Sequence, residues 1–275
     1  MSSNISLKLY NLIKTSVIKS NAQFWKSYYN EEVINAYPCD LQAIKQELEE
    51  KGINVISVFD ENFPSVNAKL KNSEKPYFFT YKGDIMLLNN TDKNVAVIAI
   101  LTPTNDIIER EQKVVKSLTE KGFNIVSGLA KGCDMVAHGE SVKINAKTIA
   151  FLPSIVENIY PKENINLANE IIKNDGLIIS EYVNESKNRY ESVRRFIDRD
   201  RLQALYSKSV VLIASFRKGE GDSGSRHAFE KAKEYGKKRL VMFRESDSNN
   251  LMFGLNKDYV MKGETVISLK EIEEL

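Results

Sequence analysis

The chain has few cysteines and lacks the long apolar run of a membrane-spanning segment. Only two cysteines, Cys39 and Cys133, occur in its 275 residues, and they are far apart and outside any CxxC spacing. No apolar run reaches the roughly 18 residues that a membrane span needs, and the N-terminus lacks the uninterrupted apolar stretch of a signal peptide. These absences argue against a disulfide framework and a membrane partner, and they predict a cytoplasmic location.

An excess of charge of one sign is also missing. The 39 Lys and Arg residues nearly balance the 37 Asp and Glu residues, so the formal net charge is only +2. This balance excludes a uniformly basic coat for nucleic acid but leaves room for a local basic groove. Hydrophobic residues make up 42% and charged residues 28% of the chain, as in ordinary globular domains, which excludes extensive disorder.

Residues 1–90 differ in pattern from the remainder and predict a small helical region followed by a segment that leads into a sheet. Asp40 is placed to cap a helix, and Gly52 is placed to end it. The polar stretch 89–94 is the best candidate for a domain boundary. The expected elements are helices over 4–20 and 41–51, strands over 55–58 and 77–81, and a short helix after Pro64.

Residues 91–275 alternate strand-like and helix-like segments. The run 95–101 is continuously apolar, which is typical of a strand buried on both faces. The alternation predicts an α/β domain of Rossmann-like type, with a mostly parallel sheet and helices on both faces. The expected strands are 95–101, 123–126, 147–152, 177–180, 209–214 and 238–243, and the expected helices are 106–121, 134–144, 165–174, 192–206 and 225–235.

The sequence SGLAKGCD over 127–134 joins a predicted strand to a predicted helix, where open α/β sheets bind their ligands. Gly128 and Gly132 let the backbone approach a ligand closely, and Lys131 adds a positive charge to the free N–H groups of the helix. Ser127 begins the turn. Such a turn suits a phosphate, although a tight connection without any ligand explains the glycines equally well.

A second glycine-rich turn precedes the helix over 225–235. Ser223 or Ser225 could cap that helix and, with Gly224, leave N–H groups for an oxyanion. Two anion sites along one sheet edge would suit a polyanion better than one small phosphate. Taken alone, the turn is better explained as a mobile loop with a good N-cap.

Arginines cluster on the helix over 192–206 and just before it. A buried stripe of apolar residues would leave several of them facing outward, toward phosphates or bases. The alternative, which is usual for charge runs, is a solvated face that pairs with Asp198 and Asp200. The arginines are Arg189, Arg194, Arg195, Arg199 and Arg201, and the expected buried stripe is Val193, Phe196, Leu202, Leu205 and Tyr206.

The sequence offers little support for catalysis, a metal or a cofactor. Asp134 and His138 could share a helix face, but no third ligand or nucleophile accompanies them. His227 lies beside the second turn and alone decides nothing. Motifs of the HExxH, GxSxG and zinc-deaminase types are missing. We therefore expect a binding protein, with no enzymatic activity, metal or cofactor.

In order along the chain, these segments resemble the DprA/Smf family of DNA-processing proteins. Residues 127–138 match its SGLARGIDxxAH segment almost position by position, and 177–182 match its LLSEY. The resemblance covers residues 54–245. The other matching segments are 59–64, 76–83, 148–153, 159–164 (IYPxEN), 196–207 (FPxRNRIIAGLS) and 223–225 (SGS).

The resemblance implies an extended Rossmann-like domain, often a homodimer, that binds single-stranded DNA without chemistry. It also implies loading of a RecA-type recombinase in DNA recombination and natural transformation. Arg194 and Arg195 join the candidate DNA-contacting residues from the arginine cluster. The positions carried over from the family are Ser127, Gly128, Lys131, Gly132, Arg199, Arg201, Ser223, Gly224 and Ser225.

The chain also departs from the family pattern. Residues 100–104 replace the family's GSR segment without glycine or arginine, so one phosphate contact is expected to be missing or rebuilt. Ile197 and Asp200 replace a proline and an asparagine, and an acid beside a phosphate would repel it. The loop 216–222 is longer than in the family, and no winged-helix tail is expected after residue 243.

Two other functions stay open at this point. The same turns could hold a mononucleotide or a nucleotide-derived signal, or belong to a phosphoribohydrolase-like enzyme, although the PGGxGTxxE pattern of such enzymes is missing. The chain could also be a scaffold with a degenerate pocket. The role of residues 1–50 is open.

Overall fold

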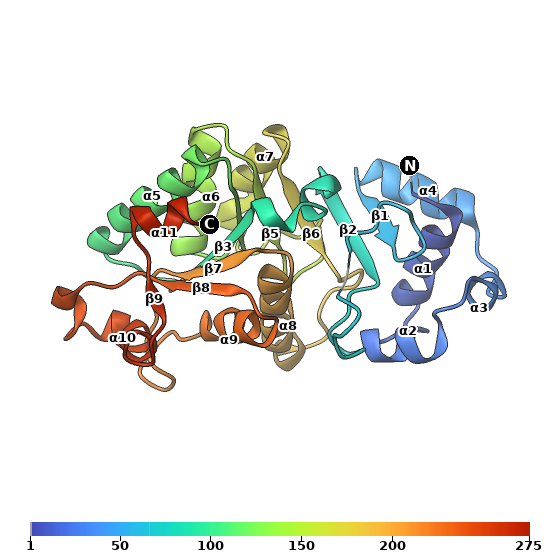
Figure 1. The fold of residues 1–275 in the computed structure, drawn as a ribbon. Coiled ribbons are helices and arrows are strands. Elements are labelled where there is room, and N and C mark those ends of the chain that lie inside the picture. Colours follow the sequence, from blue (N-terminus) through green and yellow to red (C-terminus); the bar gives the residue numbers. More distant parts are fainter. Residues whose placement is uncertain (1, 66) are drawn as a thin grey trace.

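The computed structural model describes residues 2–65 and 67–275, and within them one sheet of nine strands organises the fold (Figure 1). The strand order is β1-β2-β6-β5-β4-β3-β7-β8-β9. β1 and β2 are antiparallel to their neighbours, and all other pairs are parallel. The strands are β1 Asn54–Ser57, β2 Phe78–Gly83, β3 Asn94–Ile98, β4 Asn124–Ser127, β5 Thr148–Phe151, β6 Leu177–Ser180, β7 Ser209–Leu212, β8 Lys238–Val241 and β9 Thr265–Val266.

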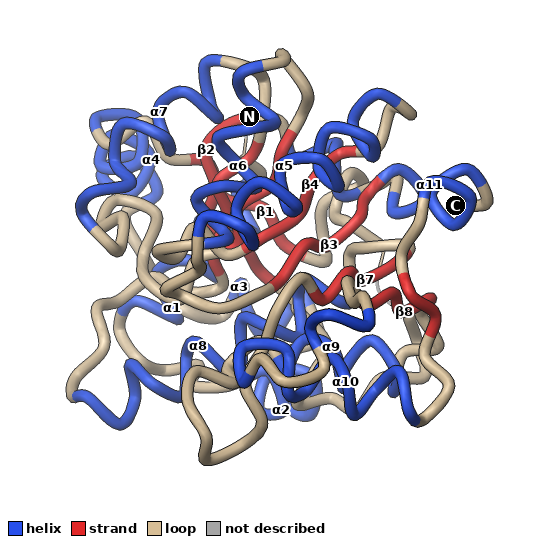
Figure 2. Tube along the Cα trace, turned by 90° about the vertical axis from the view of Figure 1, so that its left-hand side faces the viewer, coloured by secondary structure: helices blue, strands red, loops and turns tan. Residues whose placement is uncertain are grey.

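Helices cover both faces of this sheet, as predicted. In Figures 1 and 2, α5, α6 and α7 lie on one face, and α8, α9 and α10 lie on the other. α1 to α4 form the N-terminal helical region beside β1. The helices are α1 Asn4–Lys14, α2 Asn21–Ser27, α3 Glu31–Asn35, α4 Leu41–Glu50, α5 Asn105–Glu120, α6 Cys133–Lys143, α7 Ile165–Lys173, α8 Arg189–Leu205, α9 Arg226–Glu234, α10 Gly254–Met261 and α11 Leu269–Glu273.

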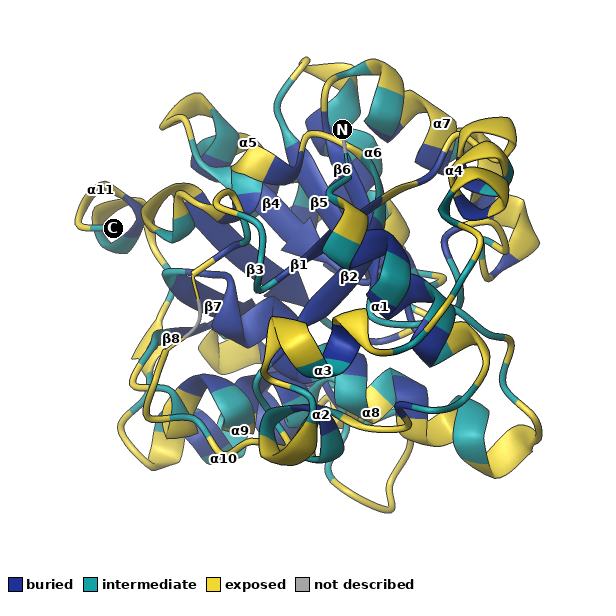
Figure 3. Cartoon of the chain, turned by 90° about the vertical axis from the view of Figure 1, so that its right-hand side faces the viewer, coloured by how far each residue is buried: buried dark blue, intermediate teal, exposed yellow. Residues whose placement is uncertain are grey.

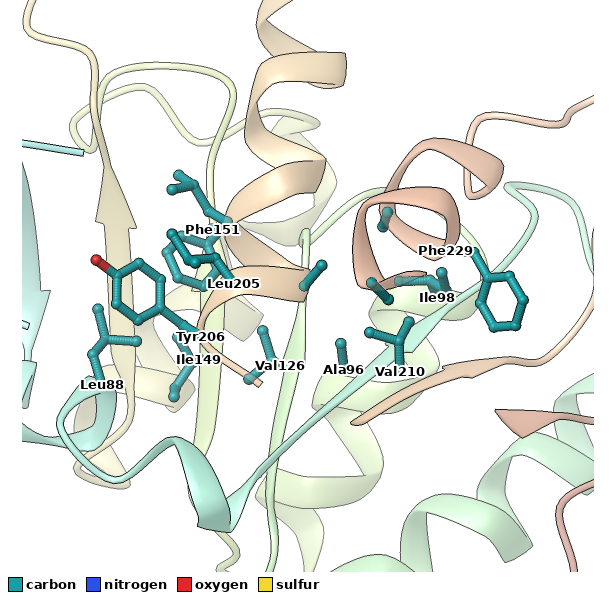
Figure 4. Close-up of a cluster of buried hydrophobic side chains, with 14 of the residues drawn as sticks. Leu88, Ala96, Ile98, Val126, Ile149, Phe151, Leu205, Tyr206, Val210 and Phe229 are labelled. Atoms are coloured by element: carbon teal, nitrogen blue, oxygen red, sulfur yellow. The ribbon is translucent and has the colours of Figure 1, made fainter. Parts of the chain in front are cut away.

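The apolar run of β3 is buried on both sides. Val95 and Val97 pack in the cluster under α5 and α6, whereas Ala96 and Ile98 pack in the cluster under α8 and α9. Figure 4 shows the second cluster, in which Tyr206 fills the space between strands and helix. This double burial confirms the strand type that the continuous apolar run predicted.

The N-terminal helices share a core with the sheet. Leu9, Phe24 and Ile34 belong to the same buried cluster as Ile178 of β6 and Ala150 of β5. Figure 3 shows the strands buried beneath helices whose outward faces are exposed. The domain division at residue 90 falls between two strands of one sheet and stays a prediction.

Several expected elements were confirmed and a few were wrong. The Asp40 carboxylate caps α4 by accepting from the N–H of Ala43 at 3.0 Å, and Gly52 follows with a φ of +59°. The helix expected over 4–20 ends at Lys14, because Ser16 adopts a left-handed φ of 60°, and the next helix begins only at Asn21. The short helix after Pro64 does not form in the described residues, which make turns there. α10, β9 and α11 were not predicted.

None of the helices in the described part of the chain combines the length and apolar character that a membrane crossing requires.

Candidate functional site

The strand order places a topological switch point between β3 and β7. From β3 the chain adds β4, β5 and β6 on one side, and from β7 it adds β8 and β9 on the other. In open α/β sheets, ligands bind outside the carboxyl ends of the strands at such a point. The loops after β3, β4 and β7 meet there, and the two glycine-rich turns belong to the last two of these loops.

The first turn and α8 are in direct contact. A Cβ built on Gly128 would overlap the guanidinium group of Arg199, so the glycine allows this arginine to lie against the turn. Gly132 has a φ of +73°, and a Cβ there would overlap the carbonyl of Leu101 in the loop after β3. The N–H of Cys133 donates to the carbonyl of Ile100 at 3.3 Å. The turn is therefore fixed between the β3 loop and α8.

A carboxylate of the chain itself occupies the N–H groups of this turn. Asp134 Oδ2 accepts from the N–H groups of Gly128 and Ala130, each at 3.2 Å. The same oxygen lies 3.8 Å from Nη1 of Arg199. Burial raises the pKa of Asp134, although Arg199 and the two N–H groups oppose that rise. The N–H groups expected to be free were those of the following helix, and of these the N–H of Cys133 already donates to the carbonyl of Ile100.

Ser127 and Lys131 point in different directions. Ser127 is buried, and its hydroxyl donates to the carbonyl of Val97 at 2.8 Å, which ties β4 to β3. The Lys131 side chain is 60% exposed, and its Nζ lies 2.9 Å from Oε1 of Glu163. Lys131 is therefore the accessible positive charge of this turn, whereas Ser127 supports it from beneath.

Asp134 is followed one helical turn later by His138, which is also buried. Its Nδ1 lies 2.7 Å from the Thr148 hydroxyl, which in turn donates to the carbonyl of Ile125. Burial lowers the pKa of His138 to about 3, so the ring is neutral. The described residues contain no group of three or more His, Cys, Asp or Glu side chains arranged to hold a metal ion.

The hydrogen bonds of the second turn, which precedes α9, differ from those predicted. Ser225 is the N-cap residue of α9, but its backbone is already helical and its hydroxyl accepts no cap hydrogen bond. The N–H groups of Arg226 and His227 instead donate to the carbonyls of Ser223 and Gly224, at 3.2 and 3.0 Å. The predicted side-chain cap was therefore wrong for both serines.

Asp222 joins the second turn to the loop after β3. Its Oδ2 accepts from the N–H of Leu101 at 2.7 Å, and its Oδ1 accepts from the N–H of Gly224 at 3.3 Å. β3 ends at Ile98, three residues before the predicted end of the strand. Where the family has its GSR segment, this chain therefore has the carboxylate of Asp222 bound to the loop after β3.

Three of the five clustered arginines are buried, so the expectation that they face outward was wrong for these. Arg195 pairs with Glu191 at 2.7 Å and stacks on Tyr182, with Cζ 4.2 Å from the ring centre. Arg201 pairs with Glu181 at 2.7 Å. Arg199 lies on the first turn. The side chains of Arg195, Arg199 and Arg201 are 7%, 5% and 8% exposed.

The helix α8 is buried differently from the predicted stripe. Its C-terminal part lies between the sheet and α9, so every residue from 201 to 207 is buried, including the predicted Leu202, Leu205 and Tyr206. Its N-terminal part reaches solvent. Val193 is 53% exposed rather than buried. Arg194, 69% exposed, faces outward as predicted beside Asp198, and Arg189 is exposed as well.

Around Arg199 the site has carboxylates on one side and aromatic rings on the other. Asp200 Oδ1 lies 3.6 Å from Nε of Arg199, and burial raises the pKa of Asp200 to about 7. The Phe196 ring lies 5.9 Å from the guanidinium carbon and meets the exposed Tyr160 edge-on, with ring centres 6.1 Å apart. Sequence reasoning assigned Phe196 to the core and overlooked Tyr160. The IYPxEN match was the signal that could have identified it.

The chain is similar to known proteins in both sequence and fold. A family model described as DNA recombination-mediator protein A matches residues 54–274. DNA processing protein DprA of Bacillus subtilis is 29% identical over 206 residues, which cover 75% of this chain and 65% of that protein. The aligned part therefore spans just under two thirds of the Bacillus protein.

Two solved structures share the fold. DNA processing protein A of Streptococcus pneumoniae superimposes with a TM-score of 0.71 at 22% identity, covering 98% of this chain and 92% of that one. DNA processing protein A of Helicobacter pylori gives a TM-score of 0.65 at 26% identity, covering 81% and 94%. The Helicobacter structure is described as giving insight into that protein's single-stranded DNA binding mode.

Proposed function

Because this chain belongs to the DNA recombination-mediator protein A family, also called DprA/Smf, we propose that it binds single-stranded DNA through the phosphate backbone. The binding site is the carboxyl edge of the sheet where the loops after β3, β4 and β7 meet. Binding is sequence-tolerant and involves no chemical step. In this role the chain is a DNA-processing protein of the cytoplasm.

The observation that carries the proposal is the contact between Arg199 and the Gly128 turn at the switch point. A guanidinium group is planar and offers several N–H donors, so it can bind two oxygens of one phosphate. Lys131 adds an exposed charge on the same turn. The proposed contact region consists of Gly128, Lys131, Gly132, Arg199, Ser223, Gly224 and Ser225, with Arg194 as an outer contact on α8 and the buried Ser127 supporting the first turn from beneath.

Arg195 and Arg201 have a positioning role in this proposal instead of a contact role. Both guanidinium groups already donate short hydrogen bonds, to Glu191 and to Glu181, whereas the equally buried Arg199 lies 3.6 and 3.8 Å from the carboxylates beside it. Arg195 and Arg201 hold α8 in place, so that Arg199 reaches the turn. The exposed Tyr160 and the half-buried Phe196 lie next to Arg199, where rings can stack on the bases between phosphates.

The proposal of protein partners is supported by family membership. We propose that the chain transfers bound DNA to a RecA-type recombinase and that it acts as a homodimer.

A salt titration tests the DNA-binding proposal. Log affinity for an oligo-dT strand should fall linearly with log salt, with a slope of about −0.7 for each phosphate neutralised. Lys131→Ala should reduce the slope by about one such unit. Lys143→Ala is the matched control, because Lys143 is equally exposed but lies at the far end of α6.

If the DNA site includes the Gly128 turn, Lys131→Ala should reduce the salt slope and Lys143→Ala should leave it unchanged. Equal slopes for the Lys131 and Lys143 variants would move the site elsewhere. Folded protein that binds no oligo-dT at low salt would overturn the function itself.

A further inference from the structure

The site around Arg199 contains more negative than positive charge. Asp134 Oδ2 and Asp200 Oδ1 lie 3.8 and 3.6 Å from nitrogens of this guanidinium group. Asp222, which binds the N–H of Leu101 in the loop after β3, adds a third carboxylate that raises the pKa of Asp200. The side chains of Asp134, Asp200 and Arg199 are 12%, 14% and 5% exposed, so water screens them little. One buried guanidinium group does not balance three carboxylates, and like charges at such a site favour protonation of one of them.

The hydrogen bonds show which carboxyl group is least stabilised as an anion. Asp134 accepts two backbone N–H groups, and Asp222 accepts one from Leu101 and one from Gly224. From the described residues, Asp200 accepts only a long bond of 3.5 Å, donated by the amide of Gln203. Burial, opposed by Arg199 and reinforced by Asp134 and Asp222, raises the pKa of Asp200 to about 7. Asp200 is therefore the group that gains or loses a proton near neutral pH.

Position 200 is one of the places where this chain departs from the family motif over residues 196–207. An asparagine in that motif is neutral and can donate a hydrogen bond, and a protonated aspartic acid shares both properties. An ionised Asp200 instead repels a second anion that approaches Arg199.

We propose that Asp200 sets the pH range in which this site accepts a phosphate of single-stranded DNA, because its side chain must be protonated before the phosphate can approach Arg199. The inference rests on the proposed function. It makes binding a proton-linked step, in which the protein takes up one proton as the phosphate enters.

Other charged groups face the same site. Asp134 on α6, whose pKa burial also raises, accepts two backbone N–H groups, and Asp222 before α9 accepts two as well. His138 remains neutral because burial lowers its pKa to about 3. Burial and two neighbouring cations, Arg226 and Lys218, lower the pKa of His227 below its usual range. His227 therefore gains charge only at pH values below those at which Asp200 titrates.

The test measures the dissociation constant of a fluorescein-labelled oligo-dT strand by anisotropy at pH 6, 7 and 8 and constant low salt. If only the protonated form binds, a pKa of about 7 for Asp200 makes binding about tenfold weaker at pH 8 than at pH 6. Asp200→Asn should bind at pH 8 as tightly as the parent binds at pH 6, with a flat profile. His227→Gln is the control and should keep the parent's profile.

A second variant tests the same idea while keeping Asp200. Asp222→Asn removes one negative charge beside Asp200, so the midpoint of the pH profile should move to lower pH. Identical profiles for the parent and Asp200→Asn, or a profile that becomes flat in His227→Gln, would overturn the inference while the proposed function stands. Failure of all folded variants to bind at every pH would overturn the proposed function as well.

Discussion

Position 128 has room for a hydrogen atom and nothing larger. A Cβ there would overlap three atoms of the Arg199 guanidinium group, yet the backbone of Gly128 does not have the positive φ that elsewhere favours glycine. The glycine is needed for the close approach of an arginine, not for the shape of the turn. Glycine loses more conformational entropy on folding than other residues do. Here the contact with Arg199, which any larger side chain would prevent, offsets that cost.

Gly128→Ala is expected to displace Arg199 and weaken binding of oligo-dT by about tenfold or more, because each hydrogen bond to a charged group contributes about 1.5–3 kcal/mol. Anisotropy titration measures the loss. Gly139→Ala is the control, since Gly139 lies in α6 with nothing within 4 Å of a new methyl group. The control should keep full affinity and gain about 0.5–1 kcal/mol in stability. Equal losses of affinity in both variants would contradict the assigned role.

Sequence reasoning found the right loops but not the partners of their polar groups. Glycines between a strand and a helix form a local pattern, and the turns at Gly128 and Gly224 lie at the predicted sheet edge. The acceptor for Leu101 could not be predicted in this way, because Asp222 lies 121 positions further along the chain. Charge pairing between distant residues depends on the fold, so the sequence could not show which arginines would be buried.

At the scale of an element, α8 changes character along its length. Its N-terminal half exposes Tyr190, Val193 and Ile197, whereas residues 201–205 are buried on all sides. Apolar residues at helical spacing predict one buried stripe along the whole helix. This pattern fits neither the exposed N-terminal half of α8 nor its fully buried C-terminal half. The buried half needs partners for its charges, and Arg201 obtains them from Glu181 and from the carbonyl of Glu74.

Arg201→Ala is expected to lower the free energy of unfolding by about 3–5 kcal/mol, because it leaves the Glu181 carboxylate buried without its cation. Urea unfolding followed by circular dichroism measures this change. Arg194→Ala, on the exposed half of the same helix, should alter stability by less than about 0.5 kcal/mol. If Arg201→Ala instead kept its stability and lost only DNA affinity, Arg201 would be the contact residue that the family motif implies.

At the scale of the whole molecule, alternation of strands and helices was enough to predict the class of fold. The parallel strands β3 to β8 and the helices on both faces follow from local periodicity, which tertiary packing reinforces. The attachment of β1 and β2 to β6 was not predictable, since antiparallel pairing across 100 residues, as between Thr80 and Ser180, leaves no local pattern.

The molecule as a whole should distinguish a strand of DNA from a single nucleotide. The two turns and α8 lie along one edge, so several phosphates of one strand can be bound together, whereas a mononucleotide reaches one position. An oligo-dT strand is therefore expected to raise the melting temperature, and dTMP at the same nucleotide concentration is not. A larger rise with dTMP in a thermal-shift assay would favour a nucleotide sensor instead.

The antiparallel pair β1–β2 covers one edge of the parallel part of the sheet. β2 satisfies the outer backbone groups of β6, an entirely buried and mostly aliphatic strand. A chain shortened to residues 91–275 would leave β6 as an open edge, which is a template for pairing with other molecules. We therefore expect a fragment cut at the polar boundary near residue 90 to aggregate more readily than the full chain.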